Sequence, residues 1–191
     1  CWQIPVDADT AISGRWAPAP GEALFEALRE EFGTLPVVAE DLGLITPAVH
    51  RLREQFGLPG MRILQFAFDG GADNPYLPHN HELNTVVYTG THDNDTTLAW
   101  FDGLPAEQQC SVLEYLGHPG EPMPWPLMRA ALASVARLAI LPMQDVLQLG
   151  SGHRMNMPGS TAENWQWRFD WSDVPTDLAG RMRQLMQVYG R

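Results

Sequence analysis

Apolar residues along the chain form two patterns, short continuous runs and stripes at helical spacing. The short runs are bounded by turn residues and predict four buried strands, at Leu35–Ala39, Met61–Phe68, Thr85–Thr89 and within Ala139–Val146. Because the runs show no polar alternation, they are typical of a parallel sheet covered by helices.

The helical stripes lie between these runs and after the last of them. The spacing predicts helices at about 22–32, 46–56, 95–102, 105–116 and 126–137, and a final amphipathic helix through Leu178, Met182, Leu185 and Tyr189. Gly33 ends the first helix, and Thr46-Pro47 provides a capping hydroxyl and a proline for the start of the second. Strand and helix therefore repeat as about four βα units. Four such units are half of a (β/α)₈ TIM-type barrel, whose sites lie where strands end and loops begin.

Composition narrows the class of protein and of partner. A chain of 191 residues suffices for one domain with a sizeable core, and we treat 1–191 as a single domain. The net charge of −11 argues against nucleic acid or an anionic membrane as partner. No apolar run approaches the ~18 residues of a membrane span. The sequence begins at Cys1 rather than Met, so we expect it to be part of a longer protein.

The cysteines and the glycines exclude several kinds of site. Cys1 and Cys110 form neither a disulfide framework nor zinc-binding spacing, and they favour a reducing, cytoplasmic location. No Gly-rich dinucleotide or phosphate-binding motif is present. The chemistry must therefore come from other residues.

Polar side chains follow three of the predicted strands. Glu40-Asp41 follows the first, Asp69 the second, and Thr91-His92-Asp93-Asn94-Asp95 the third. We expect burial beside apolar neighbours to keep Glu40 protonated near neutral pH, as a general acid for a glycosidic oxygen requires. Asp93 stays ionised if it accepts hydrogen bonds, and can then stabilise an oxocarbenium-like charge. Two carboxylates in different environments are what glycosyl transfer requires.

Each of these residues also has a purely structural interpretation. A Glu-Asp pair after a strand is often a helix cap or an ion-pair partner. His92 could ligate a metal, but the adjacent acidic side chains cannot all converge on one ion, so we expect no metal site. Asn156 would by default be a turn residue, and Trp165 and Trp167 would be core residues.

The segments that carry these residues resemble glycoside hydrolase family 77, the 4-α-glucanotransferases or amylomaltases. The resemblance spans the whole chain, in order, and rests on several linked motifs: Ala-Glu-Asp-Leu-Gly-Leu-Ile-Thr-Pro at 39–47, Phe-Gly-Leu-Pro-Gly-Met at 56–61, Tyr-Leu-Pro-His-Asn at 76–80, Thr-Gly-Thr-His-Asp-Asn-Asp-Thr-Thr at 89–97, Pro-Met-Gln-Asp-Val-Leu at 142–147 and Arg-Met-Asn-Met-Pro-Gly at 154–159.

The resemblance implies the C-terminal half of a (β/α)₈ barrel and a retaining transfer of α-1,4-glucan segments to the 4-hydroxyl of an acceptor glucan or glucose. Glu40 would be the general acid/base, Asp93 would stabilise the transition state, and His92 would bind the sugar at the cleavage point. Asp69 and Asn156 would form hydrogen bonds to the glucan. The implied partners are maltooligosaccharides and starch or glycogen fragments, and no metal or organic cofactor is implied.

One departure from the family pattern changes the expectation for this chain. The family's nucleophilic Asp lies in an Arg-Ile-Asp-His segment upstream of a Trp-x-Ile-Pro stretch. Here Trp2-Gln3-Ile4-Pro5 is preceded only by Cys1. Spacing alone would make Asp93 the nucleophile beside Glu40, but the resemblance assigns that role to the absent Asp. We therefore expect the isolated chain to be inactive, because a retaining transfer needs its covalent step.

Half a barrel also leaves open sheet edges, so we expect a homodimer or a contact with the missing half. Two other functions stay open. The chain could be a non-catalytic glucan-binding module that uses His92, Asp93 and the Trp-rich loop around Trp165-Gln166-Trp167, or a hydrolase that uses Glu40 and Asp93 as an inverting pair.

Overall fold

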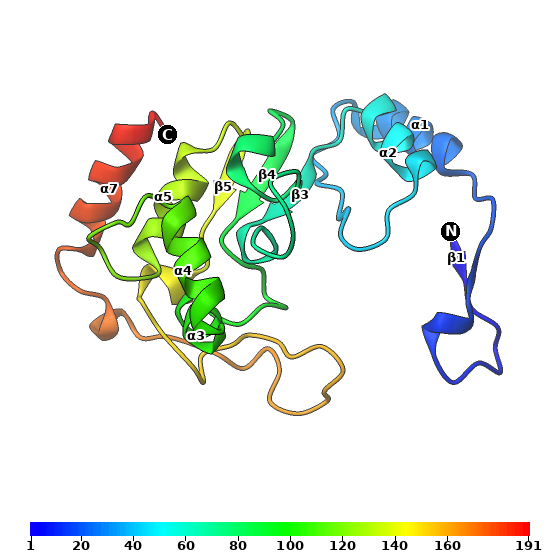
Figure 1. The fold of residues 1–191 in the computed structure, drawn as a ribbon. Helices are drawn as coiled ribbons and strands as arrows, with labels where there is room; N and C mark the ends of the chain where they lie inside the picture. The colour runs from blue at the N-terminus through cyan, green and yellow to red at the C-terminus, as the bar shows by residue number, and fades with distance from the viewer.

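The computed structural model describes residues 1–191 and has two parts, a sheet covered by helices and an extended N-terminal arm (Figure 1). The sheet is parallel, with strand order β3-β4-β5. Its strands are β3 (Gly60–Ile63), β4 (Thr85–Tyr88) and β5 (Leu138–Ile140). Gly60 pairs with Thr85, and Val86 pairs with Leu138. The α/β class with a parallel sheet is confirmed, but no closed barrel is present.

Five helices accompany the sheet, and all but the fourth, which lies in a run predicted as a strand, follow the predicted order. They are α3 (Thr97–Gly103), α4 (Ala106–Tyr115), α5 (Trp125–Ala133), α6 (Met143–Val146) and α7 (Leu178–Tyr189). α3 begins at a true cap, because the Thr96 hydroxyl accepts a hydrogen bond from the Ala99 amide at 3.2 Å. No helix combines the length and the apolar character that a membrane span needs.

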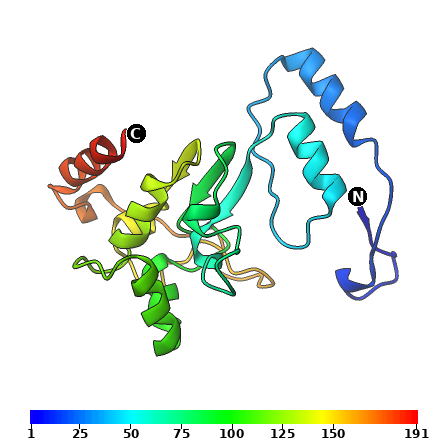
Figure 2. The same cartoon turned by 45° about the horizontal axis from the view of Figure 1, so that its top comes forward.

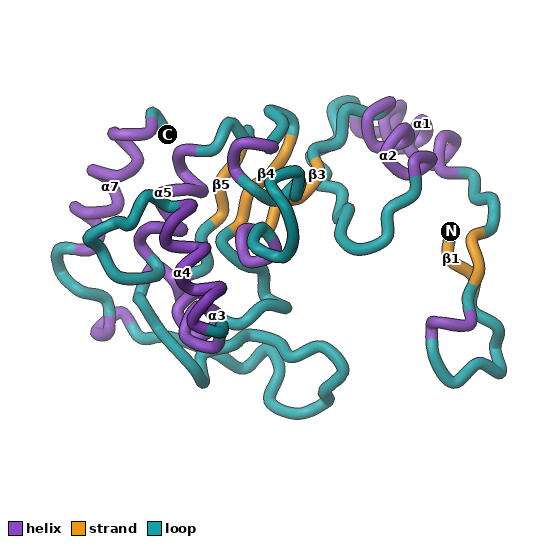
Figure 3. Tube along the Cα trace, in the orientation of Figure 1, coloured by secondary structure: helices purple, strands orange, loops and turns teal.

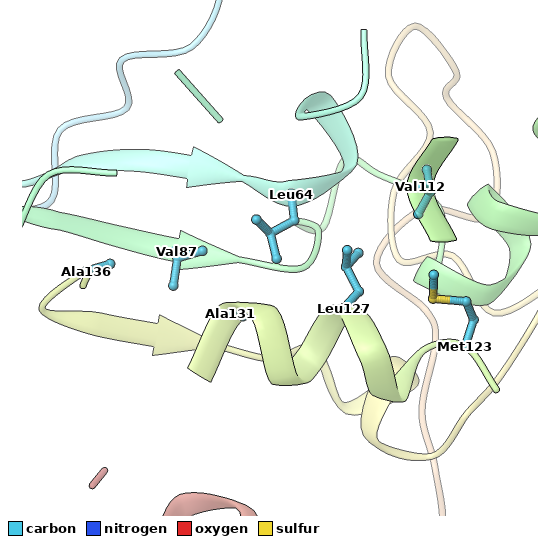
Figure 4. Close-up of a cluster of buried hydrophobic side chains, with 7 residues drawn as sticks. All are labelled: Leu64, Val87, Val112, Met123, Leu127, Ala131 and Ala136. Atoms are coloured by element: carbon cyan, nitrogen blue, oxygen red, sulfur yellow. The ribbon is translucent and has the colours of Figure 1, made fainter. Parts of the chain in front are cut away.

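α5 lies between the sheet and α7, and both of its faces are apolar. The first core cluster joins it to the strands and to α4 (Figure 4), and consists of Leu64, Val87, Val112, Met123, Leu127, Ala131 and Ala136. The second joins its far side to α7, and consists of Trp125, Met128, Leu132, Leu178 and Leu185. Six of the nine residues of α5 are buried, as expected of a helix whose apolar residues contact two neighbouring layers.

The N-terminal arm leaves the sheet at its β3 edge and is built from small elements joined by long loops (Figures 2 and 3). β1 (Trp2–Gln3) and β2 (Arg15–Trp16) form an antiparallel pair. α1 (Gly21–Phe32) and α2 (Pro47–Gln55) follow. No residue of α1 is fully buried. On the apolar stripe that predicted this helix, Phe25 packs against Phe56 with ring centroids 5.2 Å apart, whereas Leu24 and Phe32 are exposed.

The predicted strand at Leu35–Ala39 is wrong, because this segment is extended but forms no ladder. It makes a single backbone hydrogen bond toward β3, from the Ala39 amide to the Pro59 carbonyl at 2.8 Å. Val37 and Val38 are 38% and 41% exposed. Proline has no N–H to donate, and Pro36 and Pro59 therefore remove two of the donors that a ladder at this edge would use.

Two other strands are shorter than the apolar runs that predicted them. β3 ends at Ile63, and the run continues as a 3₁₀ helix over Leu64–Phe66. The last run gives only β5, after which Pro142 introduces α6. A continuous apolar run marks burial, but it does not distinguish a strand from a buried helical turn. Because Leu35–Ala39 forms no strand, the sheet has three strands instead of four.

Candidate functional site

The loop after β4 carries two of the predicted site residues at its tip. Asn94 closes the loop, because its Oδ1 accepts hydrogen bonds from the amide and the hydroxyl of Thr91, both at 2.9 Å. The side chains of His92 and Asp93 are left about half exposed. In this motif Thr91 and Asn94 therefore form the turn, while the side chains of His92 and Asp93 are exposed on it.

The base of this loop is fixed to β3 and its following turn. The Gln65 side-chain amide donates to the Asp95 carbonyl at 2.9 Å. A Cβ on Gly90 would lie 2.5 Å from the same amide nitrogen, so only glycine lets Gln65 approach this closely. The buried Gln65 therefore holds the base of the loop close to the turn that follows β3.

Asp145 joins the two ends of the loop through hydrogen bonds. Its carboxylate accepts hydrogen bonds from the Thr89 hydroxyl at 2.5 Å, the Thr97 amide at 2.7 Å and the Thr97 hydroxyl at 2.7 Å. Asp145 is only 1% exposed. Burial raises the pKa of this carboxyl, and the hydrogen bonds from Thr89 and Thr97 partly oppose that rise.

Asp93 is held by a second loop, from about residue 153 to 165, that approaches it from the far end of the sequence. Asn156 Nδ2 donates to Asp93 Oδ1 at 2.6 Å, and its backbone amide donates to the His92 carbonyl at 3.0 Å. His92 Nε2 lies 3.4 Å from Asp93 Oδ2. Arg154 donates to the Asn156 carbonyl at 2.7 Å and also to the Asp93 carbonyl. Asp93 thus accepts a hydrogen bond, as the sequence interpretation required.

Trp165 lies beside His92 at the end of this second loop. The two ring centroids are 4.8 Å apart, with an interplanar angle of 42°. Trp165 is 55% exposed, so the expectation that it is a core residue is wrong. Trp167 is partly buried and donates through its indole N–H to His153 at 3.2 Å.

Glu40 lies in the coil before α2 and is exposed. The burial that we expected to keep it protonated is absent in this chain, because Val37 and Val38 are themselves exposed. No hydrogen bond or ion pair joins the Glu40 side chain to Asp93. The structure therefore does not bring the two predicted catalytic carboxylates together by direct contact.

Asp41, next to Glu40, anchors this segment to β3. It is buried, and its Oδ1 accepts a hydrogen bond from the Met61 amide at 2.7 Å. Its Oδ2 lies 3.5 Å from Arg53 Nε and 3.6 Å from Arg62 Nη1. The structural interpretation of the Glu-Asp pair as an ion-pair partner thus applies to Asp41, whereas Glu40 forms no ion pair.

Asp69 is exposed at the end of the turn that follows β3. Only its backbone is engaged, since its carbonyl accepts a hydrogen bond from Asn74 Nδ2 at 3.1 Å. The Asp69 carboxylate has no partner within the chain and does not contact Asp93 or Asn156.

A cavity of about 360 Å³ opens beside His92 at the carboxyl ends of the strands. Apolar residues form much of its wall, namely Met61, Tyr88, Ile140, Met155 and Trp165. Polar groups also line it, among them Asp95, Gln144 and Arg154. His92 is the only predicted site residue that lines this cavity. No three His, Cys, Asp or Glu side chains lie close enough together to hold a metal ion.

No role in the site was predicted for Asp145 or Arg154, and Trp165 was treated as a core residue by default. Asp145 lies inside the apolar run that predicted the fourth strand, so it did not mark the end of a strand as Glu40 and Asp69 did. Arg154 and Trp165 lie on an irregular loop. Neither has a local pattern that connects it to His92 or Asp93.

Comparison with known proteins identifies relatives along the whole chain. The family model described as 4-alpha-glucanotransferase matches residues 1–173. The 4-alpha-glucanotransferase of Thermus thermophilus is 49% identical, with the match covering 100% of this chain and 40% of the relative. A chloroplastic/amyloplastic 4-alpha-glucanotransferase of Arabidopsis thaliana is 48% identical, covering 100% of this chain and 34% of the relative.

A solved structure matches equally completely. The amylomaltase of Streptococcus agalactiae in complex with acarbose superimposes with a TM-score of 0.93 at 38% identity, covering 100% of this chain and 39% of that protein. The chain therefore spans well under two thirds of the length of each of these relatives.

Proposed function

The chain belongs to the 4-alpha-glucanotransferase family, glycoside hydrolase family 77, and from this premise we propose that it supplies the acid/base side of a glucan-transferring active site. In this proposal Glu40 is the general acid/base, Asp93 stabilises the transition state, and His92 binds the sugar at the cleavage point. Asp69 and Asn156 form hydrogen bonds to the glucan. The substrates are α-1,4-glucans, transferred to the 4-hydroxyl of an acceptor with retention of configuration.

The observation that carries this proposal is the arrangement around Asp93. Asn156 and His92 face its two carboxylate oxygens, at 2.6 Å and 3.4 Å, and leave it accessible from solvent. A carboxylate so oriented at the carboxyl ends of parallel strands suits stabilisation of an oxocarbenium-like charge. The acarbose complex of the Streptococcus agalactiae relative supports a sugar-like ligand for this fold.

We also propose that the three-stranded sheet is part of a half-barrel, and that a further polypeptide segment is needed to complete the barrel. The chain exposes 12016 Å², whereas a compact protein of 21.3 kDa exposes roughly 9,100 Å². Exposed apolar side chains gather on the arm and on β5, including Leu24, Phe32, Val37, Val38 and Ile140. A homodimer is the other arrangement that would cover them, and sedimentation showing a compact monomer would count against both.

The covalent step needs a nucleophile that these 191 residues do not supply. They contain no Arg-Ile-Asp-His segment, which is where the resemblance places the family's nucleophilic Asp. We therefore propose that the 191-residue chain alone does not turn over glucans. Its compartment is proposed as the cytoplasm, which the two free cysteines favour.

The test compares the chain alone with a chimera in which it replaces the matching part of the Thermus thermophilus relative. Each is incubated with maltotriose, and the products are separated by length. The transferase proposal predicts longer and shorter glucans from the chimera and no conversion by the chain alone. Glucose release by the chain alone, with water as acceptor, would instead establish the inverting hydrolase. Maltooligosaccharide binding with an inactive chimera would favour the non-catalytic module.

A further inference from the structure

We propose that the indole of Trp165 is a stacking platform for a glucosyl unit, next to the unit that His92 contacts. This inference rests on the proposed function, because it assigns a further binding residue to the same glucan site. Three independent features of Trp165 support it: its backbone conformation, its exposure and its place in the wall of the cavity.

The backbone of Trp165 is held in an unfavourable conformation. Its φ is +65°, a region that bulky residues rarely adopt. The conformation is held by two hydrogen bonds, one from the Trp165 amide to the Met155 carbonyl at 2.8 Å and one from the Met157 amide to Oδ1 of the preceding residue, Asn164, at 2.9 Å. Strain of this kind persists where the surrounding structure enforces it, and it is concentrated at ligand sites.

This strain does not serve packing, because Trp165 is 55% exposed. Its ring contacts His92 on one side and lines the cavity beside that residue. A large aromatic surface that faces a cavity and solvent costs free energy unless a ligand covers it. The apolar C–H face of a glucopyranose ring fits such a surface, while its hydroxyls remain free for the polar groups of the same cavity.

Polar groups line the same cavity and can donate hydrogen bonds. Arg154 and Gln144 line the same cavity as Trp165, and the guanidinium of Arg154 already links Asp93 to Asn156 through their carbonyls. An aromatic wall with neighbouring amide and guanidinium donors is typical of a site that fixes the orientation of a ligand. The ligand class is therefore an α-glucan long enough to reach beyond His92.

The experiment measures the affinity of the 191-residue chain for maltoheptaose and for glucose by isothermal titration calorimetry. Trp165→Ala removes the ring and Trp165→Phe keeps a smaller one. Trp171→Ala is the matched control, because Trp171 belongs to the same Trp-rich segment, is 78% exposed and lies outside the cavity. Circular dichroism of each variant checks that the fold is intact, and Trp165→Phe serves if the alanine variant does not fold.

We expect Trp165→Ala to weaken maltoheptaose binding about three- to tenfold, with Trp165→Phe in between and Trp171→Ala unchanged. Glucose, a single unit that can occupy the His92 position alone, should lose less than twofold. Unchanged maltoheptaose affinity in Trp165→Ala would overturn the proposal. So would an equal loss for both sugars, which would mean that Trp165 only orients His92, or an absence of maltoheptaose binding by the unsubstituted chain. Failure of the proposed function is detected separately, by the product pattern of the chimera.

Discussion

Asn156 donates a 2.6 Å hydrogen bond to Asp93 across 63 positions of sequence. This bond joins the loop that follows β4 to the loop that follows α6, and it is the contact that assembles the site from two separate segments. Asn156 donates again through its backbone to the His92 carbonyl. Its position therefore fixes both residues at the tip of the first loop.

Replacing Asn156 by alanine should lower glucan transfer by the chimera. Hydrogen bonds to charged groups are worth about 1.5–3 kcal/mol, which corresponds to a roughly ten- to hundredfold lower kcat/KM. Initial rates on maltotriose give the value. Asn84→Ala is the control, since Asn84 donates only to the Gly57 carbonyl, away from the site. Equal rates for Asn156→Ala and the unsubstituted chimera would refute a role for this bond.

Asp145 should make the stability of the chain depend on pH. Its pKa is raised by burial, so the folded state holds this proton at pH values where the unfolded state has lost it. The stability that it contributes is complete below about pH 3.9, the ordinary Asp value, and is lost as the pH rises through the folded pKa. Asp145→Asn should remove this dependence.

Urea unfolding of both proteins between pH 4 and pH 8 measures the effect. The asparagine variant should gain stability relative to the unsubstituted chain as the pH increases, because other titrating groups are common to both. If the free energies of unfolding of the two proteins changed in parallel with pH, this would contradict a raised pKa at Asp145.

The two carboxylates near Arg53 should differ sharply in their effect on stability. Asp41→Ala leaves Arg53 and Arg62 buried without their partner, and should cost about 3–5 kcal/mol. Glu82→Ala removes the exposed carboxylate that lies 3.7 Å from Arg53 Nη2, and should cost less than about 1 kcal/mol. Urea denaturation of the two variants gives both values, and similar losses would show that the Asp41 contacts do not anchor β3.

Two glycine substitutions should change the stability of the chain in opposite directions. A Cβ at Gly60 would overlap the Asp41 carboxylate, so Gly60→Ala should lower the thermal midpoint and displace the segment that carries Glu40. Gly180 lies within α7 and has open space around it. Gly180→Ala should therefore stabilise the chain by about 0.5–1 kcal/mol. Calorimetry measures both, and a neutral Gly60→Ala would mean that the close approach of Asp41 is not required.

Helical periodicity predicted the helices well, because each helix carries a continuous stripe of apolar residues. Such a stripe can be recognised from the local sequence alone. α1 and α7 begin within a residue of their predicted positions. The strand at Leu35–Ala39 failed because strand formation depends on a partner, and Pro36 and Pro59 lack the N–H groups that a ladder needs. Local sequence reports burial more directly than it reports pairing.

The position of His92 and Asp93 could be predicted from the strand that precedes them, whereas Asn156 was named as a site residue only through the family resemblance. His92 and Asp93 lie at the tip of the loop after this strand, as their motif indicated. Arg154 contacts Asp93 across 61 positions of sequence, and Trp165 contacts His92 across more than 70, and no local pattern contains such contacts. The burial expected of Glu40 was inferred from apolar neighbours that are themselves exposed in this chain.

The central claim is that Glu40 is the acid/base residue of a glucan-transferring site. It is tested most directly by the rate at which the chimera carrying Glu40→Gln converts maltotriose into longer and shorter glucans. General acid–base catalysis contributes roughly 10²–10⁴-fold, so the account predicts a loss of this size with maltoheptaose affinity retained. Transfer by the Glu40→Gln chimera at the unsubstituted rate would contradict it.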